Sequence, residues 1–418
     1  MQAHVQSSRR KAPEIHRTMS TLQFCFDPFS REAHEDPYPA YRHLRELDPV
    51  HHDPARGIWF LSRHEDVQSA ARDWQTFSSS NGNDIDDTGA LMGAGNLVDL
   101  DPPLHDELRD MVRRWYAPRA VAAFEGTVRS AVRQRLGRLL SDPGQDALGN
   151  FIWPLHVDLG LAFLGIERPS AAQWCDPLLA TMTRKIGSPR LPEEAVNAAA
   201  AVRKLIVEVL GSGNAKPETI VANVSRKCRP DLAPGVMTLL LAAAVDTPSA
   251  LLGNALHLLA RHPDQRRILV DDLTLIGPAL EEVMRFESPE QSVARVTTRD
   301  VQLHGRTIPK GSRVVLLIAS ANRDERRFTE PDRFLVARPA HRNLAFGEGI
   351  HFCLGAAVAR LISRVALEEV LGAAPAYRVR GLPLRFAKQS SWGLRELWID
   401  WQPGTCLRSA GTPGKSPC

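Results

Sequence analysis

Apolar residues recur at helical spacing over most of the chain and at strand spacing over a small part of it. Apolar positions three and four residues apart predict helices at 36–47, 64–73, 103–116, 118–140, 153–164, 192–211 and 354–373. Alternating apolar and polar residues predict a hairpin that ends at 58–62 and further strands between 301 and 320. The pattern therefore predicts a fold that is mainly α with a minor β portion.

The longest apolar stretch runs from Ala233 to Arg261, where apolar residues are nearly continuous. This predicts a long helix that is buried on most of its sides. Asp246 and Pro248 interrupt the stretch, no eighteen apolar residues follow one another, and the mean hydropathy of the chain is −0.23. We therefore expect a core helix and no membrane span.

One long segment, Ser78–Asn96, is rich in Gly, Ser, Asn and Asp. Such a composition predicts a mobile loop of the kind that often carries function. Its acidic residues Asp84, Asp86 and Asp87 are expected to lie at a solvated loop tip. The alternative is that they receive a substrate amine.

Composition places the chain among ordinary globular proteins, with 418 residues, 43% hydrophobic, 24% charged and a net charge of +4. There is no internal repeat and no interior linker, so we expect one domain at 21–403, with flexible ends at 1–20 and 404–418. No basic block indicates nucleic acid. The six cysteines form no CxxC pair, which argues against zinc and against a disulfide framework and favours a reducing cytoplasm.

The most informative local feature is the segment 346–355, FGEGIHFCLG, which is followed directly by a predicted helix. Its glycines allow tight bends, so Cys353 would lie at the mouth of a loop and at a helix N-terminus. That position favours the thiolate, which is the form of cysteine that binds metal. Without further motifs, a buried and inert cysteine would be the better interpretation.

Further motifs are present, and together they resemble the cytochrome P450 family over 24–401. The segment 346–355 resembles the heme-binding loop of that family, and Glu282-Val-Met-Arg285 resembles its ExxR helix. The segments 321–324 and 331–334 match its meander, 243–247 its oxygen-binding helix, and 101–109 its C helix. The motifs occur in the order found in the family, which implies a single-domain P450 fold that encloses heme b, iron protoporphyrin IX.

The resemblance implies a role for each of the heme-site residues. Cys353 would be the thiolate ligand of the iron, and Phe346 would pack beside it and keep water from the sulfur. The two heme carboxylates need cationic donors, and the family's positions for these are here His105, Arg109, Arg295 and His351. Ala243 and Gly355 complete the predicted cofactor-binding set. Glu282, Arg285 and Arg333 are expected to form a buried ion network that supports the fold.

Asp246 and Thr247 are predicted to deliver protons during oxygen activation, because heme itself cannot supply them. Arg184, Lys185 or Arg190 would hold the Asp246 carboxylate. Pro248 removes a backbone N–H and predicts a kink, with the Thr247 hydroxyl turned to the carbonyl of Ala243. The alternative is a proline that the buried helix simply tolerates.

The predicted substrate pocket lies next to Asp246 and Thr247. The sequence does not identify the substrate. The pocket combines the 78–96 loop with side chains from three other segments, namely Leu240, Ala244, Gln291, Val293 and Trp392.

The implied activity is that of a heme-thiolate monooxygenase that uses O2 to oxidise a small organic or natural-product substrate, most simply by hydroxylation. Electrons would come from a ferredoxin or flavodoxin with an NAD(P)H-dependent reductase, docked on arginines near Cys353, namely Arg113, Arg114, Arg342, Arg360 and Arg364. Two alternatives stay open. One is oxidative coupling, cyclisation or desaturation by the same heme, and the other is a heme protein that only binds a ligand or carries electrons.

Overall fold

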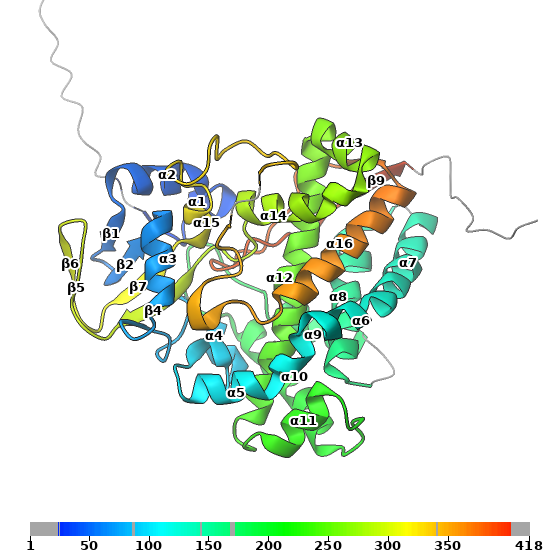
Figure 1. The fold of residues 1–418 in the computed structure, drawn as a ribbon, viewed down its shortest axis with the longest axis horizontal. Coiled ribbons are helices and arrows are strands. Elements are labelled where there is room, and N and C mark those ends of the chain that lie inside the picture. The colour runs from blue at the N-terminus through cyan, green and yellow to red at the C-terminus, as the bar shows by residue number, and fades with distance from the viewer. Residues whose placement is uncertain are drawn as a thin grey trace, which may run out of the picture.

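The structure is a computed structural model that describes residues 24, 26–85, 88–142, 144–167, 172–339 and 342–402. The predicted flexible ends, 1–20 and 404–418, lie outside the described residues, as do Asp86 and Asp87. In Figure 1 strands β1, β2 and β4–β7 gather on the left of the molecule, whereas β9 lies on the right among most of the helices.

Helices form most of the described chain, which confirms the predicted fold class. Their bounds are α1 Arg31–Glu35, α2 Tyr38–Leu47, α3 His64–Arg72, α4 Thr88–Met92, α5 Leu104–Val112, α6 Pro118–Ala123, α7 Glu125–Ser141, α8 Trp153–Leu164, α9 Ala172–Ala180, α10 Glu193–Gly211, α11 Ile220–Lys227, α12 Ala233–Arg261, α13 Pro263–Asp271, α14 Ile276–Phe286, α15 Ile318–Ala321 and α16 Ala356–Ala373. The predicted helix at 118–140 is divided into α6 and α7 at Phe124.

The strands form one sheet of five strands and two smaller pairs. The large sheet has the order β1-β2-β7-β4-β3, from β1 Val50–Asp53, β2 Ile58–Leu61, β7 Arg313–Leu316, β4 Val293–Thr297 and β3 Phe77–Ser78. The pairs are β5 Val301–Leu303 with β6 Arg306–Ile308, and β8 Ala376–Val379 with β9 Ile399–Gln402. The antiparallel pairing of β1 with β2 confirms the predicted hairpin before 62.

Helix α12 runs through the middle of the helical part (Figure 1) and has the bounds that its apolar pattern predicted. Its residues from Ala233 to Val245 belong to one apolar cluster with α8, α10 and α11. Its residues from Leu251 to Leu259 belong to another cluster with α7, α14 and α16. By length and composition α12 could cross a membrane, but 67% of its most apolar window is buried inside the fold, as in a core helix.

The described parts of the segment 78–96, residues 78–85 and 88–96, contain regular and closely packed structure that the composition did not predict. They contain α4, and they pack on α12 so closely that a Cβ on Gly235 would lie 1.7 Å from the carbonyl oxygen of Ala94. Asp84 is buried, and its carboxylate accepts a hydrogen bond of 2.7 Å from the N–H of Gly89. For Asp84 the expected solvated loop tip is therefore wrong, because the side chain is used to fold the loop.

Candidate active site

Cys353 is held by a tight turn directly before α16. The turn depends on Gly349, which has a φ of +66° and where a Cβ would lie 2.7 Å from the carbonyl oxygen of Ala71. The N–H of Cys353 donates to the carbonyl of Phe346 at 2.8 Å, and Gly355 is the N-cap residue of α16. The half-buried thiol therefore lies at a helix N-terminus, where the sequence pattern placed it.

The protein alone does not favour the thiolate of Cys353. Burial raises the pKa of the thiol, while the N–H of Gly355 and the guanidinium groups of Arg109 and Arg360 act to lower it. The helix N-terminus thus lowers the pKa of the thiol, as predicted, but burial raises that pKa by more. A coordinated metal ion deprotonates a thiol outright, so the site suits a metal-bound sulfur better than a free reactive one.

Four basic side chains that the sequence predicted around heme gather in one place. The rings of His105 and His351 lie 4.7 Å apart, and Arg109 donates to the carbonyl of Phe352 at 2.6 Å. Burial lowers the pKa of His351 to about 2, and the charges of Arg295, His105 and Arg109 add to this effect. The structure therefore brings residues from α5, β4 and the Cys353 turn into one positively charged cluster.

Arg295 is the clearest sign that this cluster is built for an anion. Its side chain is 5% exposed, and it makes no ion pair with any described residue. It donates only to the neighbouring carbonyl of Ala294 at 2.6 Å, and burial lowers its pKa to about 10. The carboxylates of Asp101 and Asp99 act to raise that pKa but form no ion pair with Arg295. A buried guanidinium without a paired carboxylate is costly. The propionate groups of heme would supply the missing negative charge, so the residues present fit that cofactor.

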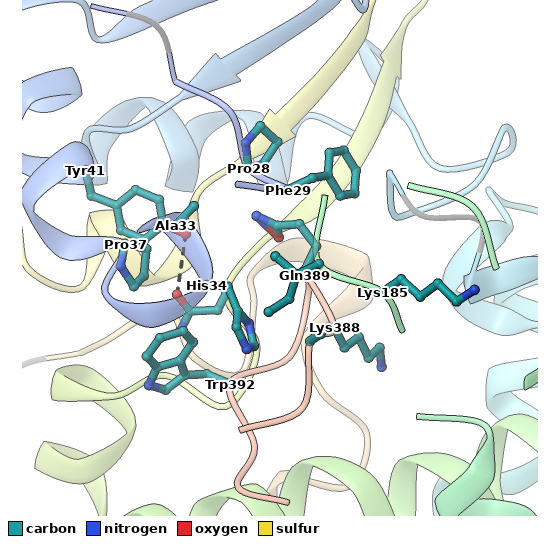
Figure 2. A pocket seen from close by; sticks show the side chains of 13 residues that line it. Pro28, Phe29, Ala33, His34, Pro37, Tyr41, Lys185, Lys388, Gln389 and Trp392 are labelled. Carbon is teal, nitrogen blue, oxygen red and sulfur yellow. Dashed lines mark hydrogen bonds between the residues drawn. The ribbon is translucent and has the colours of Figure 1, made fainter. Parts of the chain in front are cut away.

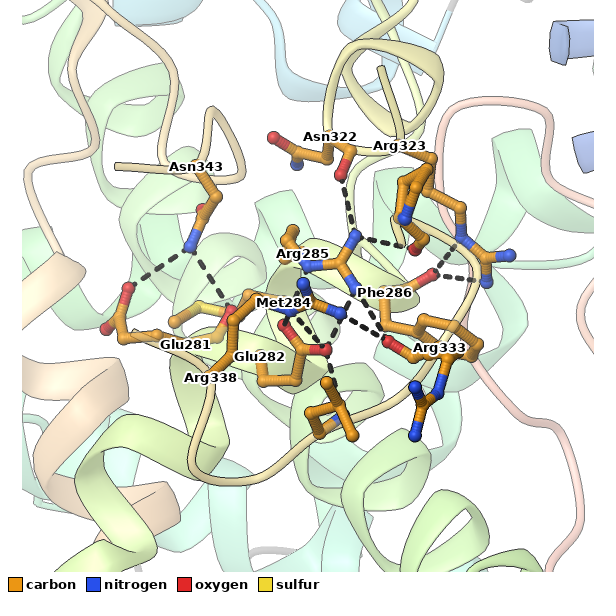
Figure 3. Close-up of polar contacts among 12 residues, drawn as sticks. Glu281, Glu282, Met284, Arg285, Phe286, Asn322, Arg323, Arg333, Arg338 and Asn343 are labelled. Carbon is orange, nitrogen blue, oxygen red and sulfur yellow. Dashed lines mark hydrogen bonds and ion pairs between the residues drawn. The ribbon is translucent and has the colours of Figure 1, made fainter. Parts of the chain in front are cut away.

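The cluster around Glu282 and Arg285 pairs its charges internally (Figure 3). Arg285 donates to both carboxylate oxygens of Glu282 at 2.7 and 2.9 Å, and both side chains are 2% exposed. Arg285 also donates to the carbonyls of Asn322 and Pro331 at 3.0 and 2.8 Å. This confirms the predicted buried pair and shows that it fastens α14 to the irregular segment that follows α15.

The predicted third member of that network is wrong. The side chain of Arg333 points to solvent, where it is 61% exposed and pairs with Glu330 at 2.6 Å, and only its carbonyl accepts from Arg285. Arg338 takes the predicted place, since its Nε lies 3.0 Å from both oxygens of Glu282. The backbone turns between the two arginines, so it is the later one that folds back over the carboxylate (Figure 3).

Asp246 is held by a residue that the sequence analysis did not consider. The Nζ of Lys388 lies 2.9 Å from Oδ2 of Asp246, and the hydroxyl of Ser391 lies 3.4 Å from Oδ1. The predicted partner Arg184 is used elsewhere, because it donates to the carbonyls of Thr181 and Thr183 at 2.8 Å. No spacing in the sequence indicates a contact between positions 142 residues apart.

The neighbourhood of Thr247 differs in one respect from the prediction. Helix α12 continues through Pro248 without a break in its assignment, and Pro248 is buried. Among the described residues no hydrogen bond joins the Thr247 hydroxyl to the carbonyl of Ala243. Ala243 is exposed although most of α12 is buried, so at this position the helix presents a small side chain to open space.

Two hollows lie near Asp246. Some of the predicted pocket residues line one of these hollows, and the others line neither. Gln291 and Trp392 line the first hollow, which lies against α1, α2 and the turn at 387–389 (Figure 2). Asp246 lines the second hollow, together with α4 and α9. Leu240, Ala244 and Val293 line neither of the two, and Ala244 faces Gly160 of α8, where a Cβ would lie 3.2 Å from its own.

Comparison with known proteins gives a consistent result. The family profile "Cytochrome P450" matches residues 231–373. The chain is 37% identical over 382 residues to Cytochrome P450 130 of Mycobacterium tuberculosis, covering 86% of this chain and 93% of the relative. It is 32% identical to the Vitamin D(3) 25-hydroxylase of Pseudonocardia autotrophica, covering 84% and 89%.

A solved structure is also similar over nearly its whole length. The structure of a mutant of P450 EryK in complex with erythromycin B has a TM-score of 0.79 and 27% identity, covering 91% of this chain and 99% of that one. The motifs around Cys353, the mainly helical fold and these matches lead to one conclusion: the chain belongs to the cytochrome P450 family and is a heme monooxygenase.

Proposed function

We propose that this enzyme binds heme b and uses it to oxidise a small organic or natural-product substrate, most simply by hydroxylation. Cys353 would be the iron ligand, while Arg109, Arg295, His105 and His351 would bind the propionates. The observation that carries this assignment is the buried cluster of basic groups around Arg295, which forms no ion pair with a carboxylate of a described residue, beside a half-buried thiol. Phe346 would shield the sulfur on the side where Arg360 covers its ring.

When bound, the heme supplies the binding and reductive activation of O2. The protein's own contribution is to position groups and to move protons. The hydroxyl of Thr247 would donate the proton, and the carboxylate of Asp246, which Lys388 holds at 2.9 Å, would return a proton to that hydroxyl. Ala243 leaves room beside them because its side chain is a single methyl group.

The substrate class is supported by the names of related proteins. One relative is named as a hydroxylase of vitamin D3, and one structural neighbour was solved with erythromycin B. Both are sizeable organic molecules, so we propose a substrate of that general kind. Growth in an atmosphere of isotopic O2 tests the reaction type, because hydroxylation places one labelled oxygen atom in the product.

Electrons would come from a ferredoxin or flavodoxin with its NAD(P)H-dependent reductase. The arginines expected to attract it are already paired, for example Arg360 with Glu281 at 2.6 Å and Arg364 with Glu125 at 2.7 Å. Paired charges attract a partner less strongly than free ones. We therefore propose weaker electrostatic steering than the sequence alone indicated, with a moderate loss of reduction rate on addition of salt.

The decisive test is the spectrum of the reduced protein with CO. A thiolate-ligated heme gives a red-shifted Soret band, and its absence in folded, heme-loaded protein would overturn the assignment. The variant Cys353→Ser should lose that band, whereas Cys175→Ser should keep it, because Cys175 lies on α9 away from the turn.

A second test addresses proton delivery. Thr247→Ala should bind the same ligands and still consume reductant, but it should release hydrogen peroxide in place of oxidised product. The ratio of peroxide to reductant consumed measures this directly. A variant that converts all of its reductant into product would remove Thr247 from the proposed route.

A further inference from the structure

The segment 78–96 begins beside the cluster of basic residues around Arg295. The hydroxyl of Ser79 lies 3.0 Å from Nε2 of His351, and Ser79 is 0% exposed. The two residues are 272 positions apart in the chain, so no local pattern in the sequence indicates this contact. A buried side chain of the segment therefore reaches the residues that we assign to the heme propionates.

The backbone of Ser79 is held in place from two sides. Its N–H donates to Oδ1 of Asp101 at 3.0 Å, and the hydroxyl of Ser78 donates to Oδ2 at 2.5 Å. Ser78 belongs to β3 and pairs with Val296 of β4, the residue next to Arg295. Asp101 lies just before α5. The Ser79 hydroxyl is thus presented to the cluster by backbone that the sheet and the start of α5 both fix.

Two contacts set the orientation of the His351 ring. The Ser79 hydroxyl lies at Nε2, and the His105 ring meets the His351 ring at 4.7 Å with an angle of 68° between the planes. The torsion that turns a histidine ring is otherwise broad, so a ring without these contacts would adopt several orientations. Because Nε2 faces Ser79, Nδ1 is the ring nitrogen that is left to bind an anion.

The contribution of Ser79 differs from that of the arginines in the cluster. Ser79 is uncharged, so it does not attract a propionate as Arg109 and Arg295 would. What it supplies is a fixed direction for a neighbouring hydrogen-bonding group. A group that is already oriented binds its ligand more tightly, because the cost of ordering it is not paid when the ligand arrives.

We propose that Ser79 is a positioning residue of the heme-propionate site, which holds the ring of His351 so that Nδ1 meets a propionate. This inference rests on the proposed function, because it takes His351 to bind a propionate of heme. It adds a residue of the segment 78–96 to that site. The retention of heme then depends on how the start of this segment is folded.

The rate of heme release tests the proposal. In Ser79→Ala, heme should pass to an acceptor protein about three- to tenfold faster than in the unaltered enzyme, which is the effect of one neutral hydrogen bond. In a His351→Leu background the same substitution should have no further effect, because the ring that Ser79 positions is gone. Ser79→Cys, which keeps the volume but bonds more weakly, repeats the test if the alanine variant does not load heme.

A second measurement separates positioning from a purely structural role. The reduction potential of the heme should fall in Ser79→Ala, because a propionate whose negative charge is less well compensated favours the oxidised iron. Ser320→Ala is the matched control, since Ser320 is equally buried and its hydroxyl donates to the carbonyl of Ser62 at 2.9 Å. This control should lower stability and leave both heme release and the potential unchanged.

Three results would overturn the proposal. They are an unchanged rate of heme release in Ser79→Ala, an equal effect of that substitution with and without His351, and equal changes of release and potential in Ser320→Ala. Any of these in protein that keeps the red-shifted CO band would leave the proposed function in place and reject the role of Ser79 alone. Coupled effects of Ser79 and His351 in protein without that band would keep the propionate site and reject the heme-thiolate assignment.

Discussion

Two buried groups of charges lie in this molecule, and they differ in what completes them. Around Glu282, one carboxylate receives two arginines and a backbone N–H, and its main cation also donates to three carbonyls. Around Arg295, cations from three segments meet without a carboxylate in an ion pair with Arg295 among the described residues. The first group is complete within the protein. In the second group His105 pairs with Asp106, and Asp101 and Asp99 act on Arg295 without an ion pair, so Arg295 is the member with a place for an anion from outside.

The difference separates a residue that serves folding from one that serves a ligand. Burial alone does not distinguish them, since Arg285 is 2% exposed and Arg295 is 5% exposed. What distinguishes them is whether the chain supplies the opposite charge. A buried charge that lacks a partner in the protein is therefore the more useful sign of a binding site.

The largest expected loss of stability follows from removing the carboxylate of Glu282 from its ion pairs with Arg285 and Arg338. Glu282→Gln should lower the free energy of unfolding by about 3–5 kcal/mol, because it leaves Arg285 and Arg338 buried without their counter-charge. Denaturation with urea measures this. Arg333→Gln is the control and should change stability by less than about 0.5 kcal/mol, because that side chain is exposed. Equal losses in the two variants would contradict the assignment of Arg338.

The next largest effect is expected for Arg295→Met. This variant should bind heme less well, while its heme-free form should be as stable as the unaltered protein or more stable. Heme should leave the variant about tenfold to a hundredfold faster, because the proposed charge-assisted contact of Arg295 with a propionate would be lost. The stability of the heme-free protein should stay the same or rise, because an unpaired buried cation is removed. Transfer of heme to an acceptor protein and urea denaturation measure the two. Unchanged heme loss would reject the anion site.

A smaller effect concerns histidines that are buried without charge. Burial lowers the pKa of His156 on α8 and of His257 on α12 to about 4 each. Between about pH 6.5 and pH 4 the unfolded chain therefore binds more protons than the folded one, and stability falls as the pH is lowered. The loss should reach at most about 3 kcal/mol per group. Urea titrations at several pH values measure it, and His156→Gln should give a shallower dependence.

The smallest effect is expected at the surface network between α7 and α16. Arg133 pairs with Glu369 at 2.9 Å, but its side chain is 66% exposed. Arg133→Ala should therefore cost less than about 0.5 kcal/mol by thermal denaturation. A loss comparable to that of Glu282→Gln would show that the contrast between buried and exposed ion pairs does not hold here.

Most of the fold could be predicted from the sequence, because the signals are local. The bounds of α12 follow from its continuous apolar residues, and the pairing of Glu282 with Arg285 follows from their spacing on one helix. The turn before α16 follows from its glycines. Each of these depends on residues that are close together in the chain.

The parts that were missed depend on distant contacts in irregular backbone. Arg338 rather than Arg333 reaches Glu282 because of how the chain turns after α15, and no periodic pattern encodes that path. Lys388 reaches Asp246 from a turn near the end of the chain. The loop at 78–96 is ordered by Asp84 and by the close approach of Ala94 to Gly235, although its composition is that of a mobile segment.

The division of α12 between two apolar clusters has a consequence for how this enzyme can diversify. The stretch 246–250 lies between the residues that serve one cluster and those that serve the other. Asp246 and Thr247 are half-buried and belong to neither cluster, so polar side chains at these two positions remove little packing from either side. These two positions can therefore vary in chemistry at small cost to stability, while the apolar clusters on either side hold the helix in place.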